Sequence, residues 1–383
     1  ALHLHSIKNK FYTLSGETGA TKIDSWIDIE GGIGNIFANA SLRKNFPDLP
    51  YHVDGDMAPL SKNGTFIGHH IMTPREGVAI HINAFNFPIW GMLEKIAVNL
   101  MAGVPAVVKP SEYTSYLTEA MVKAIIDSGI LPEGALQLVS GKGRGILDHV
   151  DFQDIVTFTG SAATGQVLRG LPHLNERSVP FNLEADSLNA AVLGPAVKPK
   201  DAEFALFVRE LANEMTVKAG QKCTAIRRAM VPEHLLPLVQ EAVIARLRKT
   251  VIGDPQAEGV RMGALATHDQ IGRVEAEMNK LMAEQELVFN PDLDIVGATD
   301  AGAFYTPKLF VNSDPFAKTK VHEVEPFGPV STLMPYKTID EAVQLTAMGR
   351  GSLVTSFASK NTSDIVAFTT EAAAYNGRIH IIN

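Results

Sequence analysis

Cys223 is the only cysteine in the 383-residue chain, and it lies within the run Ala-Gly-Gln-Lys-Cys-Thr-Ala-Ile-Arg-Arg. A single cysteine forms neither an intramolecular disulfide nor a cysteine-rich metal site, so it is a buried small side chain, an incidental residue or a nucleophile. Gly220 allows the backbone near it to approach a ligand closely. Positive charge from Lys222, Arg227 and Arg228 would favour the thiolate if these side chains point toward the sulfur.

Two polar residues could assist such a nucleophile. Asn86, in Ala-Phe-Asn-Phe-Pro, follows an expected strand and precedes an expected helix. Its amide could donate to an oxyanion, although an Asx turn or a helix cap explains an asparagine there as well. Glu184 ends an apolar run in Asn-Leu-Glu-Ala-Asp. Its carboxylate could activate water, and the alternative is a hydrogen-bonded or surface glutamate.

Two further segments suit a dinucleotide. The run Val-Val-Lys-Pro-Ser-Glu ends a strand with Lys109, Ser111 and Glu112, whose groups suit ribose hydroxyls or an adenosine phosphate. The run Phe-Thr-Gly-Ser-Ala-Ala-Thr-Gly places Gly160 and Ser161 in a turn that opens a helix, and a helix N-terminus can receive a pyrophosphate. Each segment taken alone is equally compatible with an ordinary loop.

A rigid turn near the C-terminal end, Glu-Pro-Phe-Gly-Pro, carries an acid and an aromatic ring. Glu325 and Phe327 could clamp a ribose and a nicotinamide ring, whereas the alternative is a plain proline and glycine loop.

Alternating apolar and amphipathic stretches predict the elements that must position these residues. Short strands alternate with helices up to Glu184, which predicts βαβ units and a parallel sheet with ligands at the carboxyl ends of its strands. A second α/β domain follows. The expected strands are 78–83, 105–109, 135–139, 154–158, 308–311, 329–334 and 352–357, and the expected helices are 90–102, 116–128, 201–217, 234–249, 339–347 and 363–373.

Composition excludes several classes of protein. A net charge of −8 argues against nucleic acid and anionic membranes as partners. The apolar runs are too short to form a transmembrane helix, and the N-terminus has no signal-peptide pattern. With one cysteine, the cytoplasm is the expected compartment. His69 and His70 would point to opposite faces of a strand, and no other spacing suggests a metal site.

The motifs together resemble the aldehyde dehydrogenase superfamily over essentially the whole chain. The matching signatures, in family order, are Asn-Phe-Pro, Lys-Pro-Ser-Glu, Phe-Thr-Gly-Ser, the glutamate motif, Gly-Gln-x-Cys-Thr and Glu-x-Phe-Gly-Pro. The wider runs His-Ile-Asn-Ala-Phe-Asn-Phe-Pro and Glu-Ala-Asp-Ser-Leu-Asn look closest to the semialdehyde dehydrogenases of bacterial phenylacetate and benzoyl-CoA oxidation. The resemblance implies a Rossmann-like parallel-sheet cofactor domain and an α/β catalytic domain.

The same resemblance implies roles for matched positions. Cys223 would be the nucleophile, Glu184 the general base, and Asn86 with the Cys223 backbone N–H the oxyanion hole. The implied cofactor site comprises Asn83, Ala84, Phe85, Lys109, Ser111, Glu112, Gly141, Phe158, Gly160, Ser161, Glu325 and Phe327. The implied domains are 1–57 and 76–185 for the dinucleotide, 58–75 as bridging and oligomerisation strands, and 186–383 for catalysis, with the family's outermost ends missing.

The expected substrate is an aldehyde, in particular a CoA-linked semialdehyde, and the full-length protein is expected to be a homodimer. The residues and the resemblance favour different cofactors. Glu112 favours NAD because a carboxylate repels a 2′-phosphate, whereas the resembled branch favours NADP and Lys109 could pair with that phosphate. We expect NADP, with NAD open. Two alternative functions are those of a CoA-acylating relative and of a non-catalytic cofactor-binding relative. One residue departs from the family pattern, because Phe85 stands where the family usually has tryptophan.

Overall fold

The computed structural model describes residues 1–297 and 302–383, and the chain divides into two compact units. The first unit comprises residues 1–14 and 25–185, and the second comprises 15–24 and 186–383. Among the described residues, no helix combines the length and the apolar character that crossing a bilayer demands.

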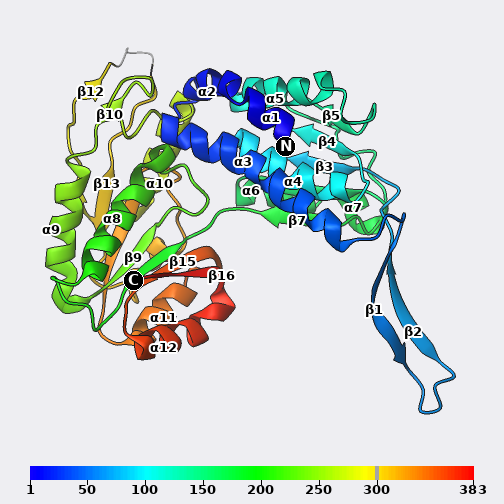
Figure 1. Cartoon of the computed structure of the whole chain (residues 1–383). Coiled ribbons are helices and arrows are strands. Elements are labelled where there is room, and N and C mark those ends of the chain that lie inside the picture. The colour runs from blue at the N-terminus through cyan, green and yellow to red at the C-terminus, as the bar shows by residue number, and fades with distance from the viewer. Residues whose placement is uncertain (298–301) are drawn as a thin grey trace. The chain divides into compact units, whose positions relative to one another are not determined.

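A five-stranded parallel sheet forms the centre of the first unit, in the order β5-β4-β3-β6-β7 (Figure 1). Apolar side chains of its two faces pack against different helices. One face, with Ala106 and Val108, packs against α4 and α5, and the other, with Ile80 and Val156, packs toward α6 and α7. The bounds are β3 Ala79–Ile82, β4 Ala106–Lys109, β5 Leu136–Leu138, β6 Ile155–Thr159, β7 Phe181–Glu184, α4 Pro88–Met101, α5 Ser115–Asp127, α6 Ala162–Arg169 and α7 Pro172–Glu176.

Three helices precede this sheet: α1 Leu2–Ile7, α2 Asn9–Gly16 and α3 Lys22–Leu42. The helix α3 was not predicted, because three glycines lower its helical propensity. Close packing against Trp90 explains two of these glycines. A Cβ at Gly31 would lie 2.2 Å from the Trp90 ring, and one at Gly32 would lie 3.0 Å from the Trp90 backbone. The glycines therefore allow α3 to approach α4 closely.

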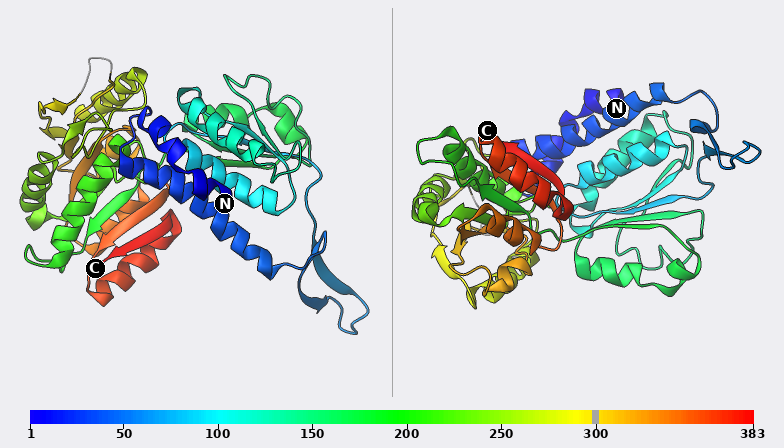
Figure 2. Two further views of the ribbon diagram at one scale, coloured as in Figure 1. Left: turned by 45° about the horizontal axis from the view of Figure 1, so that its top comes forward. Right: turned by 90° about the horizontal axis from the view of Figure 1, so that it is seen from below.

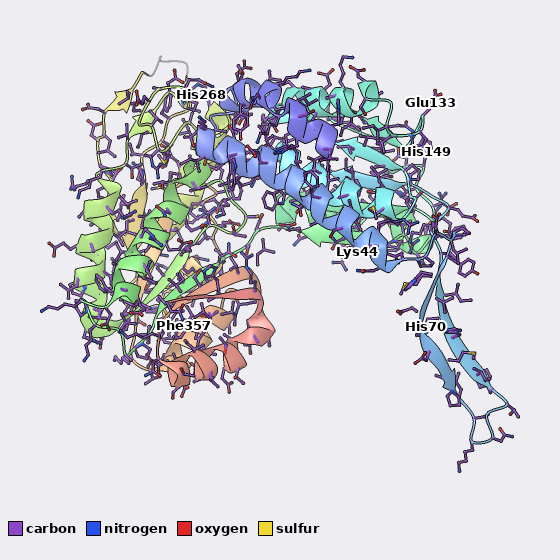
Figure 3. The ribbon with its side chains drawn as sticks, viewed as in Figure 1. Lys44, His70, Glu133, His149, His268 and Phe357 are labelled. Atoms are coloured by element: carbon purple, nitrogen blue, oxygen red, sulfur yellow. The ribbon has the colours of Figure 1, made fainter. Side chains whose placement is uncertain are left out.

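An antiparallel hairpin of β1 (His52–Pro59) and β2 (Ile67–Met72) extends away from the parallel sheet of the first unit (Figures 1 and 2). It begins ahead of the 58–75 segment expected from the sequence. His69 and His70 lie on β2 and both are exposed, with His70 labelled in Figure 3.

The second unit contains a seven-stranded sheet in the order β11-β13-β14-β9-β8-β15-β16, in which only the β11–β13 pair is antiparallel. Its strands are β8 Ala190–Leu193, β9 Arg228–Pro232, β11 Glu286–Phe289, β13 Lys308–Val311, β14 Val330–Tyr336, β15 Ser352–Ala358 and β16 Asn376–Ile382. A small parallel pair, β10 Ile252–Gly253 and β12 Ile295–Val296, lies apart from this sheet.

Helices cover both faces of the seven-stranded sheet. Successive residues of β8 show the alternation, since Ala191 packs with α8 and α9 whereas Val192 packs with α11 and α12. Phe357 on β15 stacks on Phe368 at 4.5 Å, and Figure 3 labels Phe357. The helices are α8 Ala202–Thr216, α9 Leu236–Leu247, α10 His268–Met282, α11 Ile339–Ala347 and α12 Thr362–Ala372.

The predicted α/β class and the parallel sheet are confirmed, and every helix and strand expected from the sequence is present with ends shifted by a few residues. The helix α10 and the strands β8, β9 and β11 were not predicted. Strands β8 and β9 are fully buried and short, so periodicity does not distinguish them from other apolar runs.

Candidate active site

The five parallel strands of the central sheet in the first unit have their carboxyl ends at one edge, and the predicted residues of this unit gather there. In the register of the sheet, Ile82 lies opposite both Lys109 and Phe158, and Thr159 lies opposite Glu184. The backbone continues this pairing, because Asn83 N donates to Lys109 O at 2.9 Å. The parallel register therefore brings the ends of β3, β4, β6 and β7 side by side.

Two side chains hold the turn that carries Asn86. Asp28 on α3 accepts hydrogen bonds from the backbone N–H groups of Ile89 at 3.1 Å and Trp90 at 2.7 Å, and so caps the start of α4. The Thr114 hydroxyl donates to Phe85 O at 3.2 Å. Asn86 itself is 7% exposed. Burial and these backbone bonds leave its amide little freedom.

Phe85, which replaces the expected tryptophan, has a clear packing partner. Its ring meets the Tyr113 ring edge to face, with centroids 6.1 Å apart. Tyr113 belongs to the short 3₁₀ turn Glu112–Thr114 that follows Ser111. The aromatic pair thus links the Asn86 turn to the segment that carries Ser111 and Glu112.

Asn83 places two buried polar atoms at this edge that no described residue satisfies. Its side chain is 5% exposed, and no described residue hydrogen bonds to its Oδ1 or Nδ2 atoms. A buried amide without partners costs about 1–3 kcal/mol, so such a group is normally satisfied by something outside the protein. The ribose and amide groups of a dinucleotide have matching chemistry, and the residues present fit that cofactor.

Lys109 is half-buried beside a glycine turn. A Cβ at Gly143 would lie 3.0 Å from Lys109 Cγ and Cε, so the aliphatic stem of the lysine runs along this glycine. Burial lowers the pKa of Lys109, and the nearby Glu112 carboxylate opposes that effect. Gly141 lies exposed after β5 in the same loop.

Ser161 caps the helix α6. Its hydroxyl accepts from the Thr164 backbone N–H at 3.4 Å and donates to Thr164 Oγ1 at 3.0 Å. Phe158 packs beneath the turn, since a Cβ at Gly160 would lie 2.6 Å from its ring. The turn therefore requires glycine at this position and presents the amino end of α6.

The cysteine loop of the second unit begins with a strained backbone. Lys218, Ala219 and Gly220 have φ values of 53°, 51° and 68°, a left-handed run that costs energy at the two non-glycine residues. Two buried side chains hold it. Asp24 Oδ1 accepts from Lys218 N at 2.8 Å, and the Lys218 ammonium donates to Thr18 Oγ1 at 2.8 Å.

The peptide of the half-buried Cys223 is held by Asn189, a residue to which the sequence analysis gave no role. The buried Asn189 amide donates to Cys223 O at 2.7 Å and to Ala225 O at 3.1 Å. Its Oδ1 accepts from Ser187 Oγ at 2.8 Å and from Val354 N at 3.1 Å. The only signal in the sequence was its place at the end of Glu-Ala-Asp-Ser-Leu-Asn.

The three cations near Cys223 have different partners. Lys222 pairs with Glu214 at 2.5 Å. Arg228 is fully buried and donates to the carbonyls of Leu188, Leu345 and Thr346, which directs it into the core rather than toward the sulfur. Burial lowers the pKa of Arg228 to about 9. The remaining cation, Arg227, interacts electrostatically with Cys223.

Glu325 is held on both carboxylate oxygens. Oε2 accepts from Ser187 N at 2.9 Å, and Oε1 accepts from Arg227 Nε at 3.2 Å. Phe327 lies beneath the Arg227 guanidinium, 5.5 Å from its ring centroid. Burial raises the pKa of Glu325, while Arg227 and the Ser187 N–H oppose this. A carboxylate has about four lone-pair sites, so this arrangement leaves acceptors for a ligand.

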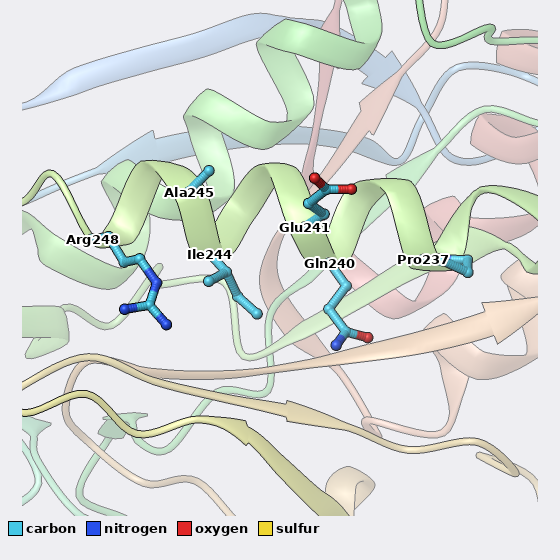
Figure 4. Close-up of a pocket in the computed structure, with 6 residues that line it drawn as sticks. All are labelled: Pro237, Gln240, Glu241, Ile244, Ala245 and Arg248. Carbon is cyan, nitrogen blue, oxygen red and sulfur yellow. The ribbon is translucent and has the colours of Figure 1, made fainter.

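In the second unit these loops precede the strands rather than follow them. Asn189 precedes β8, Cys223 precedes β9 and Glu325 precedes β14. The rule that ligands bind at carboxyl ends of parallel strands therefore describes the first unit only. Elsewhere, a hollow of about 460 Å³ lies along α9, lined by Pro237, Gln240, Glu241, Ile244, Ala245 and Arg248 (Figure 4). None of the predicted site residues lines that hollow.

Comparison with known proteins identifies the family of the chain. The profile of the Aldehyde dehydrogenase family matches residues 9–381. The chain is 41% identical over 369 residues to 3,4-dehydroadipyl-CoA semialdehyde dehydrogenase of Aromatoleum evansii, which covers 96% of this chain and 72% of that protein. It is 29% identical over 276 residues to a putative aldehyde dehydrogenase of Staphylococcus epidermidis, covering 70% of this chain and 55% of that protein.

Solved structures share the fold. Betaine aldehyde dehydrogenase from Staphylococcus aureus, in complex with NAD+, superposes with a TM-score of 0.84 at 25% identity and covers 99% of this chain and 72% of that one. Succinic semialdehyde dehydrogenase from Streptococcus pyogenes, in complex with NADP+, has a TM-score of 0.82 at 18% identity, covering 99% of this chain and 78% of that one. The chain therefore belongs to the aldehyde dehydrogenase family and is an oxidoreductase.

Proposed function

We propose that the chain oxidises an aldehyde to the carboxylic acid with NAD(P)+, through a thiohemiacetal and a thioester on Cys223. The observation that carries the proposal is the cysteine loop itself. A strained left-handed run precedes the sole cysteine, and the peptide after it is fixed by the buried Asn189. Strain that the surroundings hold in place is typical of functional sites.

The Cys223 thiolate adds to the aldehyde carbon and creates an oxyanion. The Asn86 amide and the Cys223 backbone N–H stabilise that oxygen, and losing one such donor typically lowers the rate by about 10²–10³-fold. Collapse of the thiohemiacetal expels hydride, for which bound NAD(P)+ supplies the acceptor. Cysteine suits both halves of the reaction, because it attacks well and its thioester is labile.

Glu184 is the proposed general base for the second half-reaction. It ends β7 at the carboxyl edge of the first sheet. A carboxylate there removes a proton from the water that attacks the thioester carbonyl, and the thiolate leaves as the acid forms. Transfer of the acyl group to CoA, the rival outcome, needs no such base.

The cofactor is proposed to contact Asn83, Lys109, Ser111, Glu112 and Ser161 in the first unit. Ala84, Phe85, Gly141, Phe158 and Gly160 shape the turns around them, and Glu325 and Phe327 hold the nicotinamide half. We propose NADP as the preferred cofactor because the Lys109 ammonium suits a 2′-phosphate. The exposed Glu112 carboxylate opposes this choice.

The proposed substrate is a CoA-linked semialdehyde from aromatic ring degradation. The similarity to the Aromatoleum evansii enzyme, named for such a substrate, supports this class. Extended substrates should then be preferred, because each buried CH₂ contributes about 0.8 kcal/mol, or several-fold in kcat/KM, until the site is filled.

The test is a substrate screen that follows absorbance of the reduced cofactor. It compares a series of linear aldehydes from acetaldehyde upward, a CoA-linked semialdehyde, and both cofactors. A flat profile or a preference for acetaldehyde contradicts the substrate class. A preference for NAD above about tenfold, or roughly 1.4 kcal/mol, contradicts NADP. Acyl-CoA formed from free CoA would support the CoA-acylating alternative.

A further inference from the structure

Arg227 follows the cysteine by four positions and contacts several groups around it, although no step of the proposed reaction uses it. It is 3% exposed. Its Nη2 donates to Gly220 O at 2.8 Å and its Nη1 donates to Gly328 O at 2.7 Å. Its Nε donates to the Glu325 carboxylate at 3.2 Å, and its face lies over the Phe327 ring.

These contacts join two segments that are distant in the sequence. Gly220 precedes the cysteine, whereas Glu325 and Gly328 belong to the Glu-Pro-Phe-Gly-Pro turn. Only a planar guanidinium offers three nitrogens in a fixed fork to three acceptors at once. A lysine at this position keeps the charge but reaches fewer of these oxygens.

The charges that face this group come from several elements. Arg227 has the carboxylates of Glu325 and Glu214 and the Cys223 sulfur around it, and all three raise its pKa against the lowering effect of burial. Glu214 is itself paired with Lys222. Glu325 faces Asp186, which raises its pKa, as well as Arg227, which lowers it. Because electrostatic interactions are mutual, the Arg227 charge favours the ionised forms of both Glu325 and Cys223.

We propose that Arg227 is a positioning residue that fixes the Glu325 carboxylate toward the cofactor and supplies positive charge to the Cys223 thiolate. This rests on the proposed function for the roles of Glu325 and Cys223. It assigns one buried guanidinium both to the cofactor-binding carboxylate and to the nucleophile. It also explains why the turn that carries Glu325 and the loop that carries the nucleophile share one set of hydrogen bonds.

The experiment compares Arg227→Met and Arg227→Lys with the exposed control Arg209→Lys on α8. The first readout is the pH dependence of alkylation by iodoacetamide, which reports on Cys223 alone because no other cysteine exists. The second is the dissociation constant of NADP. Neither readout requires turnover, so both remain measurable if the aldehyde assay fails and the proposed function is wrong.

Arg227→Met is expected to move the alkylation profile to higher pH by about one unit, which lowers the rate near neutral pH about tenfold. Its NADP affinity is expected to fall about tenfold or more, because Glu325 loses its cation and its orientation. Arg227→Lys should keep the alkylation profile near that of the wild type while still weakening NADP binding. A folded Arg227→Met protein with the wild-type profile and affinity would overturn the proposal.

Glu325→Gln provides the second variant if Arg227→Met does not fold. It keeps the guanidinium and removes the carboxylate that neutralises it. NADP binding is expected to weaken, while the alkylation profile moves to lower pH, opposite to the shift in Arg227→Met. A general loosening of the loops would move both profiles in the same direction, and that outcome would refute a positioning role for Arg227.

Discussion

A Cβ at Gly220 would lie 2.2 Å from the carbonyl oxygen of Gly328, so these two residues bring the cysteine loop and the Glu325 turn into direct backbone contact. Gly220 also has a φ of 68°. We predict that Gly220→Ala lowers both the melting temperature and the rate of cofactor reduction, because neither backbone can yield without moving a site residue. Thermal unfolding and steady-state assays measure the two losses.

Gly259→Ala is the matched control for this variant. Gly259 has a φ of 83°, but nothing lies within 4 Å of its Cβ position. The free energy of unfolding of this variant should therefore fall by only about 1–2 kcal/mol, which is the cost of placing an alanine in the left-handed region. Equal losses in the two variants would mean that strain alone, and not the contact with Gly328, restricts position 220.

Cys223→Ala is predicted to lower aldehyde oxidation by about 10³-fold or more, because no second cysteine exists to replace the nucleophile. NADP binding should stay within a few-fold of that of the wild type, since alanine leaves the Asn189 bonds to the loop carbonyls in place. Isothermal titration measures the affinity. Turnover at the wild-type rate would remove Cys223 from the mechanism.

Glu184→Gln is predicted to separate the two halves of the reaction. The amide keeps the shape of the side chain but cannot take a proton from water. Stopped-flow absorbance should show a burst of reduced cofactor equal to the enzyme concentration, followed by slow turnover, and mass spectrometry should find an acyl group on Cys223. Full-rate hydrolysis would point to another base.

Acid is predicted to destabilise the protein through two buried histidines. The pKa of His81 and that of His322 are each lowered from 6.5 to about 4, chiefly by burial. Both rings are hydrogen-bonded, His81 with Thr157 and Asn99, and His322 with Arg228 and Pro315. The bonds to Asn99 and Pro315 partly oppose the lowering of the pKa. The unfolded chain binds protons first as the pH falls below 6.5, so each histidine removes up to about 3 kcal/mol of stability by pH 4.

The buried carboxylates of Glu214 and Glu325 have raised pKa values, so their protonation favours the folded state as the pH falls. Because this opposes the effect of the histidines, single variants are needed to isolate the histidine contribution. His322→Asn should show a smaller fall in melting temperature between pH 7 and about 4.5 than the wild type does. His234→Asn, at an exposed position, should follow the wild type. An unchanged slope in His322→Asn would exclude His322 as a source of acid lability.

Much of the first unit could be predicted because its information is local. Apolar runs of four or five residues give the strands, and polar residues directly after them mark the edge where the strands end. Lys109, Gly160 and Glu184 lie at that edge because a parallel register aligns the ends of neighbouring strands. To place these residues at the edge, it was enough to know that each of them directly follows its own strand.

The second unit was harder to predict because its contacts join distant residues. Arg227 reaches across 98 positions to Glu325, and Asp24 reaches across 194 positions to Lys218. No local pattern distinguishes Arg227, which forms the network, from its neighbour Arg228, which turns into the core. Asn189 was equally hidden, because a buried asparagine between two apolar residues resembles a strand start until its partners are known.

The bond from Asp24 to Lys218 has a consequence for the order in which the protein can fold. Residues 15–24 belong to the second unit although the residues on either side of them belong to the first. The chain therefore contributes a short segment to the second unit near the N-terminal end of the sequence. It then forms most of the first unit and returns to the second unit only after residue 185. During synthesis the Lys218 backbone emerges long after the Asp24 carboxylate that holds it. The segment 15–24 therefore cannot form its contacts in the second unit until Lys218 has been made. A gene split at residue 185 would separate the two, and the later fragment would need the earlier one in trans to shape the loop of its own cysteine.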